Sequence, residues 1–598
     1  MIDMTIEGII VLLVIAFIIV SLYINYIGPG LTFIIGVAIL GLTKILTPGE
    51  ILSGLANEQI AVIVMLLILG DIIKRSSVID NIFNKAFEKA KTYRQFMMRM
   101  TVMVSGFSAF LNNTPLVALM MPFVNDWSKK HGVSASKLLI PLSYAAILGG
   151  CSTLIGTSTN LVVNSLVVDQ QIIPGLEPLN IFDFSFVGVP MIVLGITYLI
   201  IFGNRLLPDH KDITETISTN TREFIAEVRV TKKAAFDGKT IEEAQLRNLK
   251  GLFLVEIVRG DEAIKPVTPQ TKLSADDILM FAGNTDTISD FVTSKQGLQL
   301  SQVGMFAKLR HTELVEVVVP HNSTLISKTA KSSSFRGRFD AAIIAIHRNG
   351  ERISGKIGDV RLRAGDVLLL ITGEDFAKKV TETNDIYPIS KIKEFKKLPT
   401  YKSATLIGGT LAAVILAGLG VVSLFIALLA LLIIVTVMGI SSAKDIAKGI
   451  DFNLILIIAL SLALGTAMVK TGVANVISHY TFEMLVPLGV VGVMAGMFLL
   501  TNLMGSVITN IATVALTFPI VLTFAINSNL NPKPFILLVA FAGAANFITP
   551  IGYQTNLMVY GPGRYKFGDF LRIGFPLALM YMIVAVAGLI WQFDLRLN

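Results

Sequence analysis

The fold is decided by one uncharged, apolar run, Ser108-Ala109-Phe110-Leu111-Asn112-Asn113-Thr114-Pro115-Leu116-Val117-Ala118-Leu119-Met120-Met121-Pro122. Three polar residues and a proline stand at its centre. Pro115 lacks a backbone N–H and disfavours the α region for Thr114, so we expect one half-helix to end near Asn112 and another to begin near Pro115. A bilayer tolerates such a break only where it is buried in protein or faces a water-filled cavity. The break is therefore a candidate binding site.

The same pattern occurs again near the C-terminus, in Ser506-Val507-Ile508-Thr509-Asn510-Ile511-Ala512-Thr513-Val514-Ala515-Leu516-Thr517-Phe518-Pro519. Asn113 aligns with Asn510, and Pro122 aligns with Pro519, at a separation of 510 − 113 = 397 positions. A second pair of segments matches downstream, and its aligned residues are Thr153 with Thr549, Gly156 with Gly552, and Asn160 with Asn556. Duplicated segments with breaks in corresponding positions are typical of secondary transporters. We therefore predict a duplicated membrane unit.

The composition is that of a membrane protein. Of the 598 residues, 53% are hydrophobic and only 15% are charged, and the mean hydropathy is +0.70. Several apolar runs are long enough to span the hydrocarbon core of a bilayer. The net charge of +8 is concentrated in particular loops, so we expect no nucleic-acid partner. The single cysteine, Cys151, excludes an intrachain disulfide and a cysteine-based metal cluster.

Loop charges predict the topology of the first unit, residues 1–203. Residues 9–26 form a first predicted span with no Lys or Arg before it, so we expect a retained helix whose N-terminus lies outside. Further spans are predicted at 31–46 and 60–73. The loop that follows is predicted to be cytoplasmic from its basic residues, which are Lys74, Arg75, Lys85, Lys89, Lys91, Arg94 and Arg99.

The broken segment at 100–125 does not fit a simple crossing. Basic residues follow it at Lys129, Lys130 and Lys137, whereas the loop after Val168 is acidic. A crossing would place the basic loop outside, against the positive-inside rule. We therefore predict a re-entrant hairpin that enters and leaves on the cytoplasmic side. Residues 138–168 then cross outward, with interruptions at 149–150 and 156–160, and residues 184–202 return to the cytoplasm.

The second unit, residues 401–598, begins inside and so has the opposite orientation. Its hairpin, at 484–529, is predicted to enter from outside, and its cytoplasmic loops carry Lys444, Lys448, Arg564, Lys566 and Arg572. The predicted fold class is a polytopic α-helical membrane protein with two inverted repeats, each with a re-entrant hairpin and a broken helix. Such a pair of repeats favours a transporter over a receptor or a membrane-bound enzyme.

Between the two units, residues 204–400 are charged and turn-rich, which predicts a soluble α+β insertion in the cytoplasm. The insertion contains a repeat of its own, most clearly in L-x-x-x-D-x-L/V-L, at Leu273 to Leu279 and at Leu362 to Leu368. We divide it into domains at 204–300 and 301–400, which resemble tandem RCK C-terminal (TrkA-C-like) domains. The resemblance implies regulation by a nucleotide or another small ligand, or stabilisation of a dimer. No G-x-G-x-x-G fingerprint precedes them, so no NAD-binding partner domain is implied.

At the membrane motifs the chain resembles the divalent-anion:sodium symporter family of the ion transporter superfamily. The motifs are Asn112-Asn113-Thr114 with Leu119 to Pro122, Thr153 to Thr157 with Asn160, and their counterparts in the second unit. In that family each sodium site pairs a hairpin tip with the broken helix of the same repeat. The resemblance implies sodium ligands at Ser108, Asn113, Gly156, Asn510 and Gly552, and substrate contacts at Asn112, Asn113, Thr114, Thr157, Thr509, Asn510 and Thr555. It also implies a homodimer in the plasma membrane that moves substrate by an elevator motion.

Departures from the family pattern bear on the substrate. Asn112 stands where the family has Ser, and the second motif ends in Ile511, which lacks a hydroxyl. The family's Thr-Pro-Pro-Asn is replaced at 157–160 and again at 553–556. These departures favour a small divalent inorganic anion, sulfate above all, over a dicarboxylate. The alternative is a sodium-coupled di- or tricarboxylate transporter. From other classes, a ligand-sensing membrane protein and an anion channel stay open.

The absence of charge in the motifs bears on the coupling ion without reference to the family. No Asp, Glu, Lys or Arg occurs at 100–125, 138–168, 484–532 or 534–563. Sodium would be held by Asn oxygens, hydroxyls and unwound backbone carbonyls, and an anion by half-helix N-termini with hydroxyl and amide donors. A proton-coupled antiporter would keep a titratable carboxylate at this depth. We therefore predict sodium as the co-transported ion, with no other cofactor and no enzymatic activity.

Overall fold

The structure is a computed structural model of the chain. It describes residues 5–595 except for 25–26, 57, 76–82, 84–85, 88, 171–172, 174, 211–224, 232–236, 247–251, 260–261, 265–266, 269, 284–297, 301–312, 321–322, 349–350, 354–356, 374, 382, 384, 390–398, 443–445 and 447–451. Three predicted cytoplasmic residues, Lys85, Lys444 and Lys448, lie outside the described residues, as do large parts of the predicted insertion domains.

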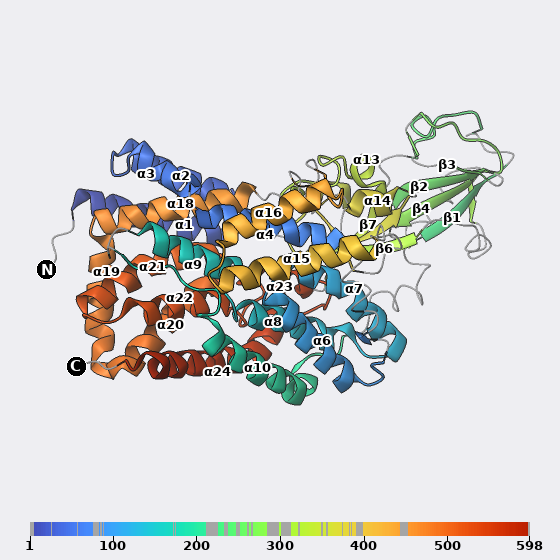
Figure 1. The fold of residues 1–598 in the computed structure, drawn as a ribbon. Helices are drawn as coiled ribbons and strands as arrows, with labels where there is room; N and C mark the ends of the chain where they lie inside the picture. The colour runs from blue at the N-terminus through green and yellow to red at the C-terminus, as the bar shows by residue number, and fades with distance from the viewer. Residues whose placement is uncertain are drawn as a thin grey trace.

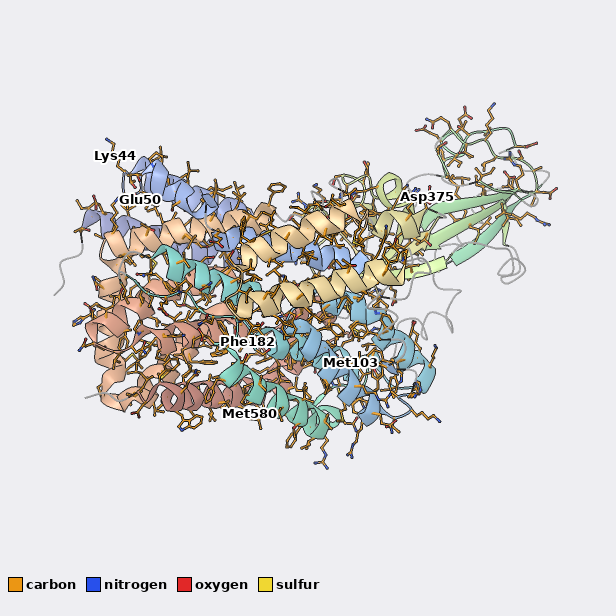
Figure 2. The ribbon with its side chains drawn as sticks, in the orientation of Figure 1. Lys44, Glu50, Met103, Phe182, Asp375 and Met580 are labelled. Atoms are coloured by element: carbon orange, nitrogen blue, oxygen red, sulfur yellow. The ribbon has the colours of Figure 1, made fainter. Side chains whose placement is uncertain are left out.

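The helices pack into one elongated body, with the β-sheets at one end and both chain termini at the other (Figure 1). Six of the described helices are long and apolar enough to cross a membrane, and a further pair, α18 and α19, passes this test together with a bend of 74° at its break. These apolar helices make the protein a multi-pass membrane protein. Figure 2 shows Lys44 and Glu50 at the end near the termini, and Met103, Phe182 and Met580 between the two ends of the body. The helices of the body outside the broken segments are α1 (Ile6–Ile24), α2 (Pro29–Leu42), α4 (Glu58–Arg75), α10 (Ser185–Leu206), α15 (Thr400–Gly418), α16 (Leu424–Val437), α18 (Phe452–Lys470), α19 (Val473–Leu485) and α24 (Phe567–Phe593).

The predicted second span, at 31–46, is not a continuous helix. α2 has 14 residues, which at about 1.5 Å per residue reach about 21 Å, less than the hydrocarbon core of about 30 Å. It ends before Lys44, which takes a left-handed φ of 62°. A capping box of Thr47 and Glu50 then starts the short helix α3 (Pro48–Leu52). Local capping therefore interrupts a run that hydropathy alone predicts as one span.

Both expected helix breaks are present, and each forms the tip of a hairpin, but the first half-helix ends at Ser108 rather than near Asn112, and the next begins at Asn113 rather than near Pro115. α6 (Tyr93–Ser108) is separated from α7 (Asn113–His131) by residues 109–112, and the side chain of Asn112 caps α7 by accepting from Thr114 N at 3.4 Å. α20 (Gly489–Val507) and α21 (Asn510–Asn527) form the second hairpin, in which Thr509 Oγ1 accepts from Ala512 N at 3.4 Å. The first hairpin lies in the half of the body near the sheets, and the second lies in the half near the termini (Figure 1).

Each hairpin packs on a second broken segment. The first segment consists of α8 (Leu139–Gly150) and α9 (Ser158–Asp169), and the second consists of α22 (Pro532–Ala544) and α23 (Gln554–Tyr560). α6 packs on α8, and both arms of the second hairpin pack on α22. α21 lies inside the body, since 83% of its apolar stretch is buried, against 22% for the stretch in α15. The second break is thus enclosed by protein, as a break in a bilayer requires.

The described parts of residues 225–389 form two antiparallel five-stranded sheets of the same topology. The first sheet runs β3-β2-β4-β1-β5, and the second, taken from the opposite edge, runs β8-β7-β9-β6-β10. A bulge occurs at the same point in each sheet, after Leu254 in one and after Ile343 in the other. The strands are β1 (Ile225–Val230), β2 (Leu252–Arg259), β3 (Glu262–Ile264), β4 (Ile278–Gly283), β5 (Leu298–Leu300), β6 (Glu313–Val318), β7 (Ala341–Arg348), β8 (Glu351–Arg352), β9 (Val367–Thr372) and β10 (Tyr387–Pro388).

The aspartate of the L-x-x-x-D motif is buried and forms an ion pair with an arginine at the same place in both sheets. Arg259 Nε lies 2.8 Å from Asp277 Oδ1, and Arg348 Nε lies 2.7 Å from Asp366 Oδ1, with both aspartate side chains fully buried. Each arginine also donates from Nη2 to the second carboxylate oxygen and to a backbone carbonyl. Bidentate pairing of this kind fixes direction as well as charge. The motif therefore has a structural role, which is to anchor the strand that follows it.

The second sheet packs directly on the helical body. A Cβ added to Gly561, after α23, would lie 2.4 Å from Gly365 O and 2.8 Å from Val367 Cγ2. On the other side, Asn125 Nδ2 in α7 donates to Ile389 O at 3.0 Å. The unit formed by this sheet and its connections, residues 313–389, is called the second sheet unit below. It contacts one arm of a hairpin and one broken segment at the same time.

The contact at Gly561 predicts the effect of a single methyl group. Gly561→Ala should lower the free energy of unfolding by about 1–3 kcal/mol, because the methyl group overlaps the backbone of the second sheet unit. Gly568→Ala is the matched control, since a Cβ there meets nothing within 4 Å. Thermal unfolding of the two variants in detergent measures the difference. Equal melting temperatures would show that the sheet does not pack at Gly561.

Candidate substrate and ion site

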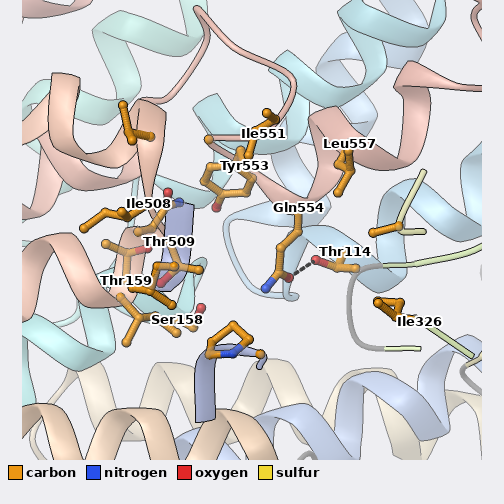
Figure 3. Close-up of a pocket in the computed structure, with 18 of the residues that line it drawn as sticks. Thr114, Ser158, Thr159, Ile326, Ile508, Thr509, Ile551, Tyr553, Gln554 and Leu557 are labelled. Carbon is orange, nitrogen blue, oxygen red and sulfur yellow. Dashed lines mark hydrogen bonds between the residues drawn. The ribbon is translucent and has the colours of Figure 1, made fainter. Parts of the chain in front are cut away.

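A cavity of about 540 Å³ lies where the two hairpin tips and the two broken segments meet (Figure 3). None of its described lining residues is charged. They are Leu22, Ile27, Gly28 and Pro29 of the α1–α2 turn, Asn112 and Thr114 of the first tip, Ser158 and Thr159 of α9, Val507 to Ile511 of the second tip, Ile551 to Gln554 with Leu557 of the second broken segment, and Ser323, Ile326, Ser327 and Ala364 of the second sheet unit.

Of the described helices that begin at this cavity, three belong to the hairpins and the first broken segment. α7 begins at Asn113, α9 at Ser158 and α21 at Asn510, and residues at each start line the cavity. A helix N-terminus carries unpaired N–H groups and the equivalent of roughly +0.5 charge. Three such termini directed at one uncharged space favour a negatively charged occupant.

Polar side chains stand on both sides of the cavity. Thr114 Oγ1 lies 2.9 Å from Gln554 Oε1, which joins the first tip to the second broken segment. Figure 3 shows this pair on one side and Ser158, Thr159 and Thr509 on the other. The cavity therefore offers hydroxyl and amide groups, which donate hydrogen bonds to an anion without carrying a formal charge.

Asn113 is buried beside the first tip, among oxygen atoms. One terminal atom of its amide faces Ser108 Oγ and the carbonyl oxygens of Ala146 and Gly156, at 3.1 and 3.2 Å from the two carbonyl oxygens. The other terminal atom lies 2.6 Å from the hydroxyl of Tyr553. An amide nitrogen turned toward the three oxygens would donate to them, whereas an amide oxygen turned toward them would complete a group of four oxygens that a cation can hold together. Tyr553 suits both orientations, because its hydroxyl both donates and accepts.

Two glycines make room for this group of oxygens. A Cβ added to Gly150 would lie 2.7 Å from both terminal atoms of Asn113. A Cβ added to Gly156 would lie 2.6 Å from Gly150 O and 2.8 Å from Ser108 O. Distances under 3 Å leave no space for a methyl group. Glycine is therefore required at Gly156, where the neighbours are backbone atoms, and at Gly150 as long as the Asn113 amide keeps its position.

Equivalent hydrogen bonds brace the two broken segments. Asn160 Nδ2 donates to Thr153 O at 2.8 Å and to Gly150 O at 3.5 Å. Its counterpart Asn556 donates to Thr549 O at 3.1 Å and to the carbonyl of residue 546 at 2.8 Å. These carbonyls lie in or next to the breaks, where no helical N–H is available to them. The two asparagines therefore satisfy backbone groups that the breaks release.

At the second tip, amide nitrogens donate hydrogen bonds to the oxygens that face the break. Asn546 Nδ2 donates to Asn510 Oδ1 at 2.8 Å and to Gly543 O at 3.0 Å. Asn502 Nδ2 donates to Ala542 O at 2.9 Å. The two hairpin tips therefore differ in chemistry although they match in sequence register.

The residues expected at the site fall into three groups. The first group lines the cavity and consists of Asn112, Thr114, Thr509, Asn510 and Gly552. The second group is buried behind the first tip and consists of Ser108, Asn113, Gly156 and Thr157, and the Thr157 hydroxyl lies 2.9 Å from that of Tyr553. The third group is Thr555 alone, whose hydroxyl lies 2.8 Å from Ser143 Oγ and not at the cavity.

The family pattern does not identify two further contacts, Tyr553 and Gln554, because both stand at departures from that pattern. Tyr553 bridges Asn113 and Thr157, and Gln554 bonds Thr114. Both stand where the second broken segment aligns with the break in the first. That alignment was the available signal, since a side chain at an aligned break is directed at the same space.

The sequence does not predict that the second sheet unit contributes to the cavity. Its loop at Ser323 and Ser327 lines the cavity. This loop is held by Asp385, which is buried, accepts from Thr324 N at 2.5 Å and forms an ion pair with Arg338. No local pattern in the loop predicts that it lies against the membrane helices.

Broken helices that meet at an uncharged cavity, in a chain with several apolar spans, define a membrane transporter. The chain belongs to the citrate transporter family of the ion transporter superfamily, which matches residues 10–525 and, in a second match, residues 411–595. The predicted resemblance to divalent-anion:sodium symporters is thus supported at the level of the superfamily. The comparisons do not show RCK C-terminal domains.

Relatives are similar over almost the whole chain. A candidate sulfur deprivation response regulator of Chlamydomonas reinhardtii is 31% identical over 93% of this chain and 96% of its own length. An uncharacterized transporter of Synechocystis is 30% identical over 95% of this chain and 94% of its own length. Sodium/sulfate cotransporter 1 of Chlamydomonas reinhardtii is 23% identical over 97% of this chain and 89% of its own length. Family and relatives point to an anion transporter and not to an enzyme.

The position of the Tyr553 hydroxyl predicts a loss of both stability and cation binding in Tyr553→Phe. The variant removes the hydroxyl that bonds both Asn113 and Thr157, which costs about 1–3 kcal/mol of unfolding free energy. Sodium should also raise the melting temperature of the variant less than that of the parent protein, because the Asn113 amide loses its hydrogen bond to the Tyr553 hydroxyl. Tyr198→Phe is the control, since Tyr198 donates to Ile573 O at 2.9 Å away from the cavity. Equal sodium effects in both variants would contradict the role of Tyr553.

Proposed function

We propose that this protein is a sodium-coupled symporter of a small divalent inorganic anion, sulfate above all, with an elevator-type alternating-access mechanism. The observation that carries the proposal is the convergence of the N-termini of α7, α9 and α21 on an uncharged cavity of about 540 Å³. Helix N-termini stabilise an anion without a buried cationic side chain. The name of the related sodium/sulfate cotransporter supports the same substrate class.

The anion binds between the first tip and the second broken segment on one side and the second tip on the other. Asn112, Thr114 and Gln554 supply donors from the first side, and Thr509 and Asn510 supply them from the second. Ser158 and Thr159 at the start of α9 complete the set. Thr555 does not contact the anion. Its hydrogen bond to Ser143 holds the second broken segment in position.

Sodium binds beside the first tip, at Asn113, Ser108 and the carbonyl oxygens of Ala146 and Gly156. All four ligands are neutral oxygens, and the Asn113 oxygen turns inward when the ion is present. The amide nitrogen then faces Tyr553, which borders the cavity. Sodium in this position fixes the first tip and places a positive charge near the anion, so that each ligand increases the affinity for the other.

The two membrane units, 1–203 and 401–598, act as inverted repeats in this proposal. Their hairpins lie in opposite halves of the body (Figure 1), and matched hydrogen bonds from Asn160 and Asn556 brace their broken segments. The hairpins and broken segments move as one unit against outer helices such as α15, in a homodimer in the plasma membrane. The insertion, with domains at 204–300 and 301–400, lies in the cytoplasm and serves regulation or dimer stability, with a nucleotide or another small molecule as its candidate ligand.

A second substrate class is a di- or tricarboxylate, carried with sodium. Membership of the citrate transporter family favours it. The cavity volume also admits it, since small-molecule sites of about 300–1,000 Å³ are common. The absence of a cationic lining side chain among the described residues favours the smaller inorganic anion, because two or three separate carboxylates would need two or three separate partners.

Uptake of radiolabelled sulfate into proteoliposomes tests the proposal. An inward sodium gradient should drive uptake and an equal potassium gradient should not. Unlabelled thiosulfate should compete and succinate or citrate should not. Competition by citrate or succinate would show that the substrate is a di- or tricarboxylate. Uptake at the same rate with and without a sodium gradient would indicate a channel or another coupling ion.

The assigned sodium ligand predicts the behaviour of Asn113→Ala. The variant should lose sodium stimulation of uptake, because its cation position lacks one of four oxygens. Asn125→Ala is the matched control, a buried amide on the same helix that donates to Ile389 O. It should keep sodium stimulation while losing about 1–3 kcal/mol of stability. Normal sodium activation of Asn113→Ala would remove the assigned ion site.

A further inference from the structure

We infer that the second hairpin tip binds no sodium, because two asparagine side chains take the place that a cation would take there, and that the protein carries its sodium at the first tip alone. The inference rests on the proposed sodium coupling and determines where it occurs. It differs from the expectation that Asn510 and Gly552 form a second sodium site.

The two tips differ by an exchange of residues between facing elements. In the sequence register, Ser108 of the first hairpin corresponds to Gly505, and Gly150 of the first broken segment corresponds to Asn546. The first tip thus has a hydroxyl on the hairpin and no side chain opposite it. The second tip has no side chain on the hairpin and an amide opposite it.

Each glycine makes room for the polar group that it faces. A Cβ on Gly150 would lie 2.7 Å from the amide of Asn113, and a Cβ on Gly505 would lie 2.6 Å from Asn546 Nδ2. Neither space can hold a methyl group and the amide together. At the second tip the exchanged residues Gly505 and Asn546 therefore face each other, and at the first tip Gly150 leaves room for Asn113.

The orientation of the amides at the second tip is determined by backbone carbonyls. Asn546 Nδ2 lies 3.0 Å from Gly543 O, and Asn502 Nδ2 lies 2.9 Å from Ala542 O and 3.1 Å from Ala545 O. Carbonyl oxygens only accept, so the nitrogen of each amide must face them. Asn546 Nδ2 also donates to Asn510 at 2.8 Å.

A cation at the second tip would have to remove these donors. Ala542 O already accepts from an amide, as does the side-chain oxygen of Asn510. Ala146 O, the counterpart of Ala542 O, accepts from the Ser108 hydroxyl at 2.7 Å, and a hydroxyl can rotate and present its own oxygen to the ion. An N–H group presents its positive end to an oxygen, as a cation does, so the two exclude each other. The second tip is in this way held in one geometry whether sodium is present or absent, and only the first tip responds to the ion.

The test counts radiolabelled sodium ions bound at equilibrium to the full-length protein in nanodiscs. The parent protein should bind one sodium ion per chain. The pair Gly505→Ser with Asn546→Gly gives the second tip the residues of the first, and it should bind one more ion. The reciprocal pair, Ser108→Gly with Gly150→Asn, gives the first tip the residues of the second and should bind none. Each variant is first checked for a single peak in gel filtration.

Two sodium ions on the parent protein would overturn the inference, and this count decides the matter even if neither variant folds. A folded Gly505→Ser, Asn546→Gly protein with no additional ion would overturn it too. Failure of the proposed function has a different signature, which is a parent protein that binds no sodium. In that case a gain of one ion in the same variant would still support the role of the amides, and no gain would contradict it.

Discussion

A helix that is interrupted inside a membrane releases backbone N–H and C=O groups that lipid cannot satisfy, and the interior of this protein is arranged around that constraint. Asn160 and Asn556 bond the carbonyls that the two broken segments leave free. The N-termini of α7, α9 and α21 meet at one cavity. The helix N-termini at the breaks thus form a site that attracts an anion without a charged side chain.

The same constraint explains why the two hairpin tips can differ. Carbonyl oxygens near a break need either an N–H donor or a cation. At the first tip, the amide of Asn113 faces Ser108 and two carbonyls in a geometry that suits a donor or an ion. At the second tip, Asn546 and Asn502 supply donors permanently. One duplicated framework thereby contains one responsive end and one fixed end, a division of roles that symmetry alone would not predict.

Much of this arrangement could be predicted from the sequence, and the limits have physical causes. Pro115 and the polar residues before it predicted the first break, and the register with Asn510 predicted its counterpart, because both are local signals. The end of α2 before Lys44 depends on local capping, which hydropathy does not detect. Tyr553 and the loop at Ser323 reach the site only through contacts between distant parts of the chain, which no spacing encodes. The exchange of Ser108 and Gly150 for Gly505 and Asn546 is visible in the alignment, but its meaning requires the distances.

The central claim is that sodium bound beside the first tip drives an anion across the membrane. The most direct test is whether radiolabelled sulfate accumulates in proteoliposomes above its external concentration under an inward sodium gradient. The account predicts a transient accumulation that collapses when a sodium ionophore dissipates the gradient. Sulfate that only equilibrates across the membrane, at the same rate with and without sodium, would contradict it.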